Sequence, residues 1–163
     1  FWINAIGFNL IWALCIFYGN SALPWVILLL VAHFLFHSQP LLELSAVTVT
    51  AFLGYLLDCI LTLAGFFRFD QVQGITPLWL VFLWIGFSCT LRQSLSYFRE
   101  HFRFSVIFGA VAGSFAYMAA ANFGAVELGF QFWHSAFLIG AIWALLFPSL
   151  VAICKPLENW LCS

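Results

Sequence analysis

Charged residues are scarce in this sequence. Only 7% of its 163 residues are Asp, Glu, Lys or Arg, whereas about 25% is typical of soluble domains. Hydrophobic residues make up 65% of the chain, and the mean hydropathy is +1.08. A soluble fold of this length cannot bury so much apolar surface, so the sequence predicts a membrane protein. The net charge is −1 and there is no basic patch, which excludes nucleic acid as a partner.

Motifs for metal, nucleotide and nucleophilic chemistry are also missing. The five cysteines form no C-x-x-C pair, and four of them lie in or beside apolar runs, as small buried hydrophobes do. The four histidines form no H-E-x-x-H motif, and there is no Gly-rich phosphate loop. Gly113-Ser114 with His134 lacks the Gly-x-Ser-Gly motif of rhomboid proteases. We therefore predict no metal, no cofactor and no catalytic residue, and we leave enzyme activity open without favouring it.

Long apolar runs are what the sequence has instead. Six such runs, separated by short polar breaks, predict an all-α polytopic membrane protein, a bundle of six transmembrane helices. The predicted spans cover about residues 1–18, 24–37, 44–67, 77–97, 104–123 and 132–154. The loops are too short for an extramembrane domain, so residues 1–163 are interpreted as one domain. Because the first residue is not Met, N-terminal residues are expected to be missing.

Basic residues predict the orientation of these spans. If both termini are cytoplasmic, four basic residues lie inside and one lies outside, as the positive-inside rule requires. The inner residues are Arg92, Arg99, Arg103 and Lys155, and the outer residue is Arg68.

One carboxylate, Asp58, lies well inside the third span. A charged group at that depth costs at least about 2.5–3.5 kcal/mol, so such residues usually face a cavity or a pathway. Counting about 1.5 Å per residue places His33 of the second span at the same depth, which predicts a His33–Asp58 pair. Tyr55, three residues before Asp58, is expected to donate a hydrogen bond to it. The alternative is a buried polar network that only stabilises the bundle.

Other polar residues are predicted near the two ends of the bundle. At the outer end, Asn122, Glu127 and His134 are candidates for a vestibule above Asp58, or they belong to a solvated loop. At the inner end, Arg92 is expected either to snorkel to the interface or to bind an anionic head group.

Small residues recur at three- and four-residue spacing along the fifth span. They are Gly109, Gly113, Ala116, Ala120 and Gly124. This spacing lets helix backbones approach closely, either within the bundle or against another chain.

Several ordered features of the chain resemble a known family. They are Asn4 with Phe8 and Trp12; His33; Asp58 followed by Leu63-Ala64-Gly65 and Phe67-x-Phe69; Pro77-Leu78-Trp79 with Trp84, Leu91 and Ser94; and Gly113, Tyr117 and Gly124-Ala125-Val126. Together they resemble a domain-of-unknown-function family of small inner-membrane proteins from Gram-negative bacteria. The resemblance covers nearly the whole chain and implies the bacterial inner membrane, but it implies no activity.

Three functions are compatible with this sequence. The leading hypothesis is a protein that binds a lipid or other hydrophobic small molecule, as a transporter or as an accessory factor in membrane-lipid metabolism. The second is an intramembrane lipid-modifying enzyme that uses His33 and Asp58 as an acid–base pair. The third is a structural subunit, so the expected partners are membrane lipids, a hydrophobic small molecule, and a membrane protein or a second copy of the chain.

Overall fold

The computed structural model describes residues 1–70 and 74–161, with side chains up to residue 154. The described chain is mainly helical. Its α-helices are α1 (Trp2–Tyr18), α2 (Leu23–Leu35), α3 (Pro40–Leu63), α4 (Leu78–Leu91), α5 (Phe102–Phe108), α6 (Ser114–Asn122) and α7 (Phe132–Leu161). Short 3-10 turns, η1 (Gly19–Ala22) and η2 (Ser96–Arg99), and a π-helical turn, η3 (Gly109–Gly113), connect some of them.

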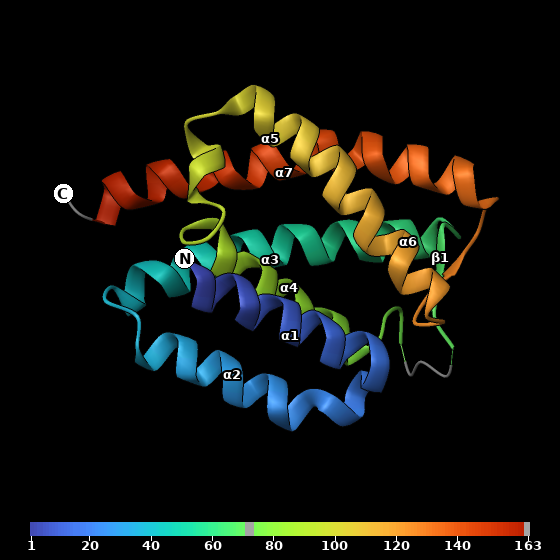
Figure 1. Cartoon of the computed structure of the whole chain (residues 1–163), viewed down its shortest axis with the longest axis horizontal. Helices are drawn as coiled ribbons and strands as arrows, with labels where there is room; N and C mark the ends of the chain where they lie inside the picture. Colours follow the sequence, from blue (N-terminus) through green and yellow to red (C-terminus); the bar gives the residue numbers. More distant parts are fainter. Residues whose placement is uncertain (71–73, 162–163) are drawn as a thin grey trace.

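Most helices run along the long axis of the molecule (Figure 1). Helices α1 and α2 form an antiparallel hairpin, α3 and α4 lie in the middle, and α5, η3 and α6 pack as one continuous stretch against α7 (Figure 1). A two-stranded antiparallel sheet joins the loops at one end, with β1 (Phe67–Arg68) paired to β2 (Glu127–Leu128). The start of α1 and the end of α7 both lie toward the opposite end (Figure 1).

Four stretches of the described chain are long and apolar enough to cross a membrane. They are Trp2–Leu35, Pro40–Leu63, Phe102–Asn122 and Phe132–Cys154. Many large apolar side chains are also exposed, including Phe36 at 89%, Phe137 at 77% and Leu145 at 74%. An exposed apolar surface of this extent is unstable in water, so the fold is that of a membrane protein.

Helices α2, α3 and α4 differ in length or in position from the spans that we predicted for them. Helices α2 and α4 have 13 and 14 residues, or about 20 Å, and are too short to cross a core about 30 Å thick without tilting or help from flanking residues. Helix α3 begins at Pro40 and ends at Leu63, whereas we predicted residues 44–67. The side chain of Lys155, used in the orientation argument, lies outside the described residues.

Two small residues of the fifth span, Gly109 and Gly113, pack against α7 of the same chain. A Cβ atom on Gly113 would overlap the Trp143 ring, and one on Gly109 would overlap the Trp143 carbonyl oxygen. The close approach predicted from the spacing is therefore present, and within the chain its partner is α7. The π-helical turn lies at this contact, where one extra residue per turn reshapes the helix surface.

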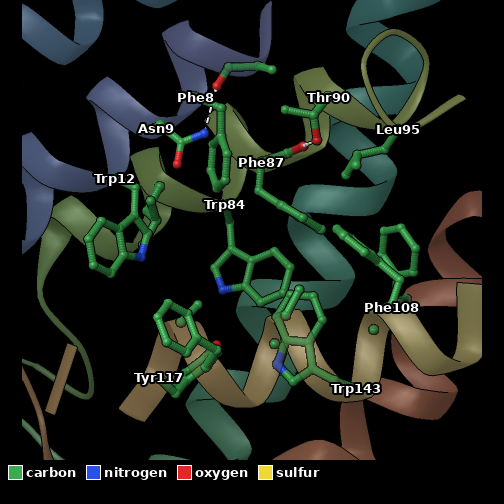
Figure 2. A pocket seen from close by; sticks show the side chains of 18 of the residues that line it. Phe8, Asn9, Trp12, Trp84, Phe87, Thr90, Leu95, Phe108, Tyr117 and Trp143 are labelled. Atoms are coloured by element: carbon green, nitrogen blue, oxygen red, sulfur yellow. Dashed lines mark hydrogen bonds between the residues drawn. The ribbon is translucent and has the colours of Figure 1, made fainter. Parts of the chain in front are cut away.

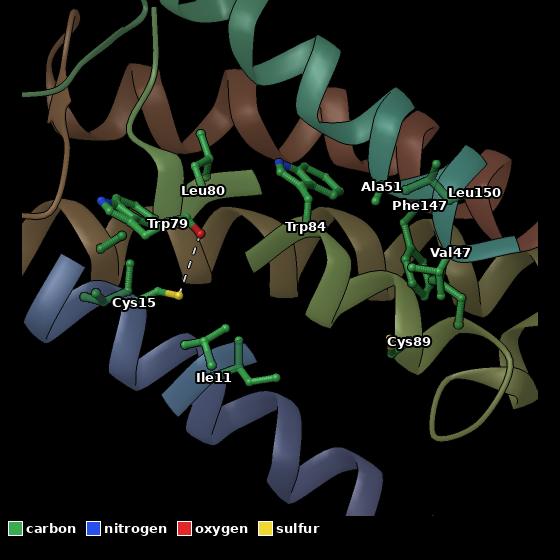
Figure 3. Close-up of a cluster of buried hydrophobic side chains, with 14 of the residues drawn as sticks. Ile11, Cys15, Val47, Ala51, Trp79, Leu80, Trp84, Cys89, Phe147 and Leu150 are labelled. Atoms are coloured by element: carbon green, nitrogen blue, oxygen red, sulfur yellow. Dashed lines mark hydrogen bonds between the residues drawn. The ribbon is translucent and has the colours of Figure 1, made fainter. Parts of the chain in front are cut away.

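Aliphatic, aromatic and sulfur-containing side chains fill the core between the helices (Figure 3). Trp79 and Trp84 of α4 are 8% and 4% exposed, and Cys15 of α1 is fully buried. The Cys15 thiol donates a long hydrogen bond of 3.7 Å to the Trp79 carbonyl oxygen (Figure 3). The described cysteines are all free and mostly buried, as expected of small core residues.

Candidate functional site

His33 and Asp58 do not pair, contrary to our prediction. His33 lies in the last turn of α2, where its Nε2 is 3.1 Å from Glu43 Oε1. Asp58 lies fifteen residues after Glu43 on α3, or about 22 Å further along the helix. The depth estimate failed because α3 starts and ends one turn earlier than predicted, which moves Asp58 toward the far end of the bundle.

Asp58 is instead held by two aromatic side chains. The indole N–H of Trp84 donates to Asp58 Oδ2 at 2.8 Å, and the hydroxyl of Tyr117 donates to Oδ1 at 2.7 Å. The carboxylate is only 2% exposed, so these hydrogen bonds replace the water that it has lost. Asp58 thereby fixes side chains from α4 and α6 to α3.

Ring stacking completes the orientation of these two aromatic residues. The Trp84 ring stacks on Trp143 of α7, with centroids 5.7 Å apart and planes 9° apart. The Tyr117 ring stacks on Phe67 of β1 at 5.0 Å. Trp84 can approach α3 because Gly54 has no side chain, since a Cβ there would overlap the indole. Contacts with three elements, α3, α7 and β1, therefore determine where Trp84 and Tyr117 point.

Tyr55 does not reach Asp58, although it is on the same helix. Its hydroxyl accepts a hydrogen bond of 2.9 Å from Thr76, in the segment that precedes α4. The aromatic hydroxyl that contacts the carboxylate is that of Tyr117, which the sequence does not place near Asp58. Its helix is distant in the chain, so no spacing rule links the two residues.

An aromatic cavity of about 410 Å³ lies beside this cluster (Figure 2). Figure 2 shows Phe8 and Thr90 at one end and Tyr117 and Trp143 at the other, with Trp84 between them. The walls come from α1, α4, η3 with α6, and α7, and they include three small residues of the π-helical turn, Gly109, Ala112 and Gly113. None of the described side chains that line the cavity is charged.

A second polar cluster surrounds Glu43, which is fully buried in the first turn of α3. Arg92 Nη1 donates to Glu43 Oε2 at 2.7 Å, and Arg92 Nη2 lies 3.3 Å from Gln39 Oε1. His37 Nε2 is 3.4 Å from the same Oε2. Arg92 was expected to snorkel or to bind a head group, but its guanidinium is committed to this ion pair.

Glu43 was missed because the third span was taken to start at Leu44, which left Glu43 in a loop. Pro40 occupies the start of the helix, where its missing N–H costs nothing. An acidic residue three positions after such a proline is typical of the first turn of a helix. That signal was present in the sequence and would have placed Glu43 on α3.

The outer-end candidates lie apart from Asp58. Asn122, Glu127 and His134 are all exposed, and Glu127 faces Arg68 in the β1–β2 pair. Asn122 and Glu127 line an open hollow with Asp70, but His134 is not among its lining residues. This arrangement fits the solvated-loop alternative better than a vestibule above the carboxylate.

Comparison with known proteins found a match to a protein family. A family model with the description "Protein of unknown function (DUF2878)" matches residues 1–149. No curated protein and no solved structure matches the chain.

Proposed function

The chain belongs to the DUF2878 family of proteins of unknown function, and for this member we propose a role in binding an uncharged hydrophobic molecule within the membrane. The protein would serve as a transporter or as an accessory factor in membrane-lipid metabolism. The observation that carries this proposal is the aromatic cavity between α1, α4, α6 and α7.

The size and lining of the cavity support a small lipid-like ligand. Its volume of about 410 Å³ falls within the range of about 300–1,000 Å³ that is common for small-molecule sites. Aromatic and aliphatic side chains dominate the wall, and the absence of charge among the described lining residues disfavours a phosphate, carboxylate or ammonium head group.

The polar atoms at one end of the cavity narrow the ligand class further. The hydroxyl of Thr90 donates to the Phe87 carbonyl oxygen, and the hydroxyl of Ser94 donates to Asn4 Oδ1. Both hydroxyl protons are therefore used within the protein, while oxygen lone pairs remain to accept a hydrogen bond. A ligand with a donor head group, such as a long-chain or isoprenoid alcohol, fits this end best.

Asp58 has a positioning role in this proposal. It does not line the cavity, but it holds the Trp84 indole and the Tyr117 hydroxyl, whose rings do. The catalytic His–Asp pair of the enzyme hypothesis has no basis in the structure, because His33 contacts Glu43.

Two adjacent residues of the π-helical turn test the proposal. Ala112 lines the cavity, whereas Val111 is 66% exposed. We expect Ala112→Phe to fill the cavity and to lower ligand retention at least tenfold, because the added ring occupies the ligand volume. Val111→Phe should leave retention unchanged. Native mass spectrometry of protein gently extracted from its own membrane measures the bound molecule in each case.

Equal retention of the same molecule by wild type, Ala112→Phe and Val111→Phe would contradict binding in this cavity. A retained molecule with a charged head group would contradict the proposed ligand class. Detergent-solution unfolding of both variants serves as the control for folding.

The six-span arrangement belongs to the same proposal. Helices α1 and α2 lie antiparallel, and the start of α1 and the end of α7 lie at the same end of the molecule (Figure 1). Both features support an even number of crossings, with α2 and α4 crossing in a locally thinned bilayer. Helical spans also suit the bacterial inner membrane, where the positive-inside rule would place both termini in the cytoplasm.

A further inference from the structure

Three potential metal ligands from three helices converge at the Glu43 cluster. His33 comes from the last turn of α2, Glu43 from the first turn of α3, and Cys89 from the last turns of α4. One ligand atom from each, an imidazole nitrogen, a carboxylate oxygen and the sulfur, lies within 4.8 Å of the other two. Glu43 and Cys89 are 0% and 3% exposed, so this is an internal site.

From this geometry we propose that the protein binds a zinc-type divalent ion through His33 Nε2, Glu43 Oε1 and Cys89 Sγ. Nitrogen, oxygen and sulfur together suit Zn²⁺, which takes four ligands in a tetrahedron at about 2.0–2.3 Å. Those bond lengths place neighbouring ligand atoms about 3.4 Å apart. The His33–Glu43 separation of 3.1 Å is already close to that value, and the sulfur has to move by about 1 Å at most.

Arg92 does not compete for the same oxygen. Its Nη1 binds Glu43 Oε2, which leaves Oε1 directed toward His33. The guanidinium therefore orients the carboxylate, as partners of metal ligands commonly do. A hydroxide in the fourth position would leave the whole set, Arg92 included, electrically neutral.

His37 is a second orienting group rather than a ligand. Its Nδ1 accepts a hydrogen bond of 3.0 Å from the backbone N–H of Gln39, so in the neutral ring the proton is on Nε2. That Nε2 lies 3.4 Å from Glu43 Oε2. Ion binding releases the thiol proton of Cys89 to the solvent, and neutral His33 then carries its proton on Nδ1 so that Nε2 can bind the ion.

The proposed site lies close to the surface of the described chain. The His33 and His37 side chains are 15% and 11% exposed, and that of Arg92 is 8% exposed, so the cluster lies just below the surface. Two residues of the cavity follow closely after Cys89: Thr90 at the end of α4 and Ser94 in the turn that follows the helix. Asn4 ties this end of α4 to α1, because its Nδ2 donates to the Cys89 carbonyl oxygen at 3.1 Å.

Cobalt binding to the full chain in detergent tests the assignment. Co²⁺ substitutes for Zn²⁺ and shows a thiolate-to-metal charge-transfer band when a cysteine is a ligand. We expect one Co²⁺ per chain, this band in wild type, and its displacement by Zn²⁺. Cys89→Ser should abolish the band and weaken binding at least tenfold, whereas the control Cys59→Ser, a free cysteine near Thr76, should change neither.

Two histidine variants keep the test decisive if Cys89→Ser folds poorly. His33→Asn should reduce Co²⁺ affinity at least tenfold, while His37→Asn should retain the charge-transfer band. Failure of wild type to bind Co²⁺ or Zn²⁺ in stoichiometric amount would overturn the proposal. A band that persists in Cys89→Ser would overturn the ligand assignment.

Discussion

Replacing Arg92 with Gln is expected to lower the free energy of unfolding by about 3–5 kcal/mol, because it leaves the buried carboxylate of Glu43 without its guanidinium partner. Glu43 is fully buried and its Oε2 accepts the 2.7 Å hydrogen bond from Arg92. A glutamine can donate a hydrogen bond but cannot neutralise the carboxylate. Unfolding in detergent, followed by circular dichroism in the presence of a chelator, measures the loss.

The double variant Glu43→Gln with Arg92→Gln provides the matched control. It removes both charges and keeps hydrogen-bonding groups on α3 and just after α4, so we expect it to recover more than half of the lost stability. A loss below about 1 kcal/mol for Arg92→Gln alone would match an exposed ion pair. That result would contradict the buried pairing described here.

Gly113→Ala is the second substitution for which we expect a large effect. The new Cβ would overlap the Trp143 ring, so either the π-helical turn η3 or the indole must move. Overpacking of this kind costs about 1–3 kcal/mol, which outweighs the gain of up to about 1 kcal/mol from the better helix propensity of alanine. Because Trp143 also stacks on Trp84, the tryptophan fluorescence should change together with the stability.

Gly7→Ala is the control for helix propensity. Gly7 lies within α1, and a Cβ there meets nothing within 4 Å. We expect this variant to be neutral or slightly more stable than wild type. Equal behaviour of Gly7→Ala and Gly113→Ala would show that η3 does not pack closely on α7.

Helix positions were largely predictable because apolar runs and proline or glycine breaks determine them locally. Pro24 and Pro77 correctly predicted where α2 and α4 begin, to within a residue. We interpreted all of Ser38-Gln39-Pro40 as a break between two helices, but Pro40 is the first residue of α3. That single turn excluded Glu43 from the predicted span and shifted the estimated depth of Asp58.

The partners of the buried polar residues could not be predicted in the same way. The sequence correctly singled out Asp58 as a carboxylate inside a span, but Trp84 and Tyr117 reach it from helices whose packing no local pattern specifies. The cavity could not be predicted for the same reason, because its walls come from four separate parts of the chain. The depth of a residue along its helix limits which other residues it can contact. The rotation of each helix about its axis and the tilt of the helix decide which of those contacts form.

Photo-crosslinking in native membranes tests the central claim most directly. The probe is a long-chain alcohol with a photoreactive diazirine, and the competitors are the unlabelled alcohol and the carboxylate of equal chain length. We predict adducts on cavity residues such as Phe8, Phe87 and Tyr117, blocked by the alcohol and not by the carboxylate. Adducts spread over exposed positions such as Leu28 and Val111, and insensitive to both competitors, would contradict the account.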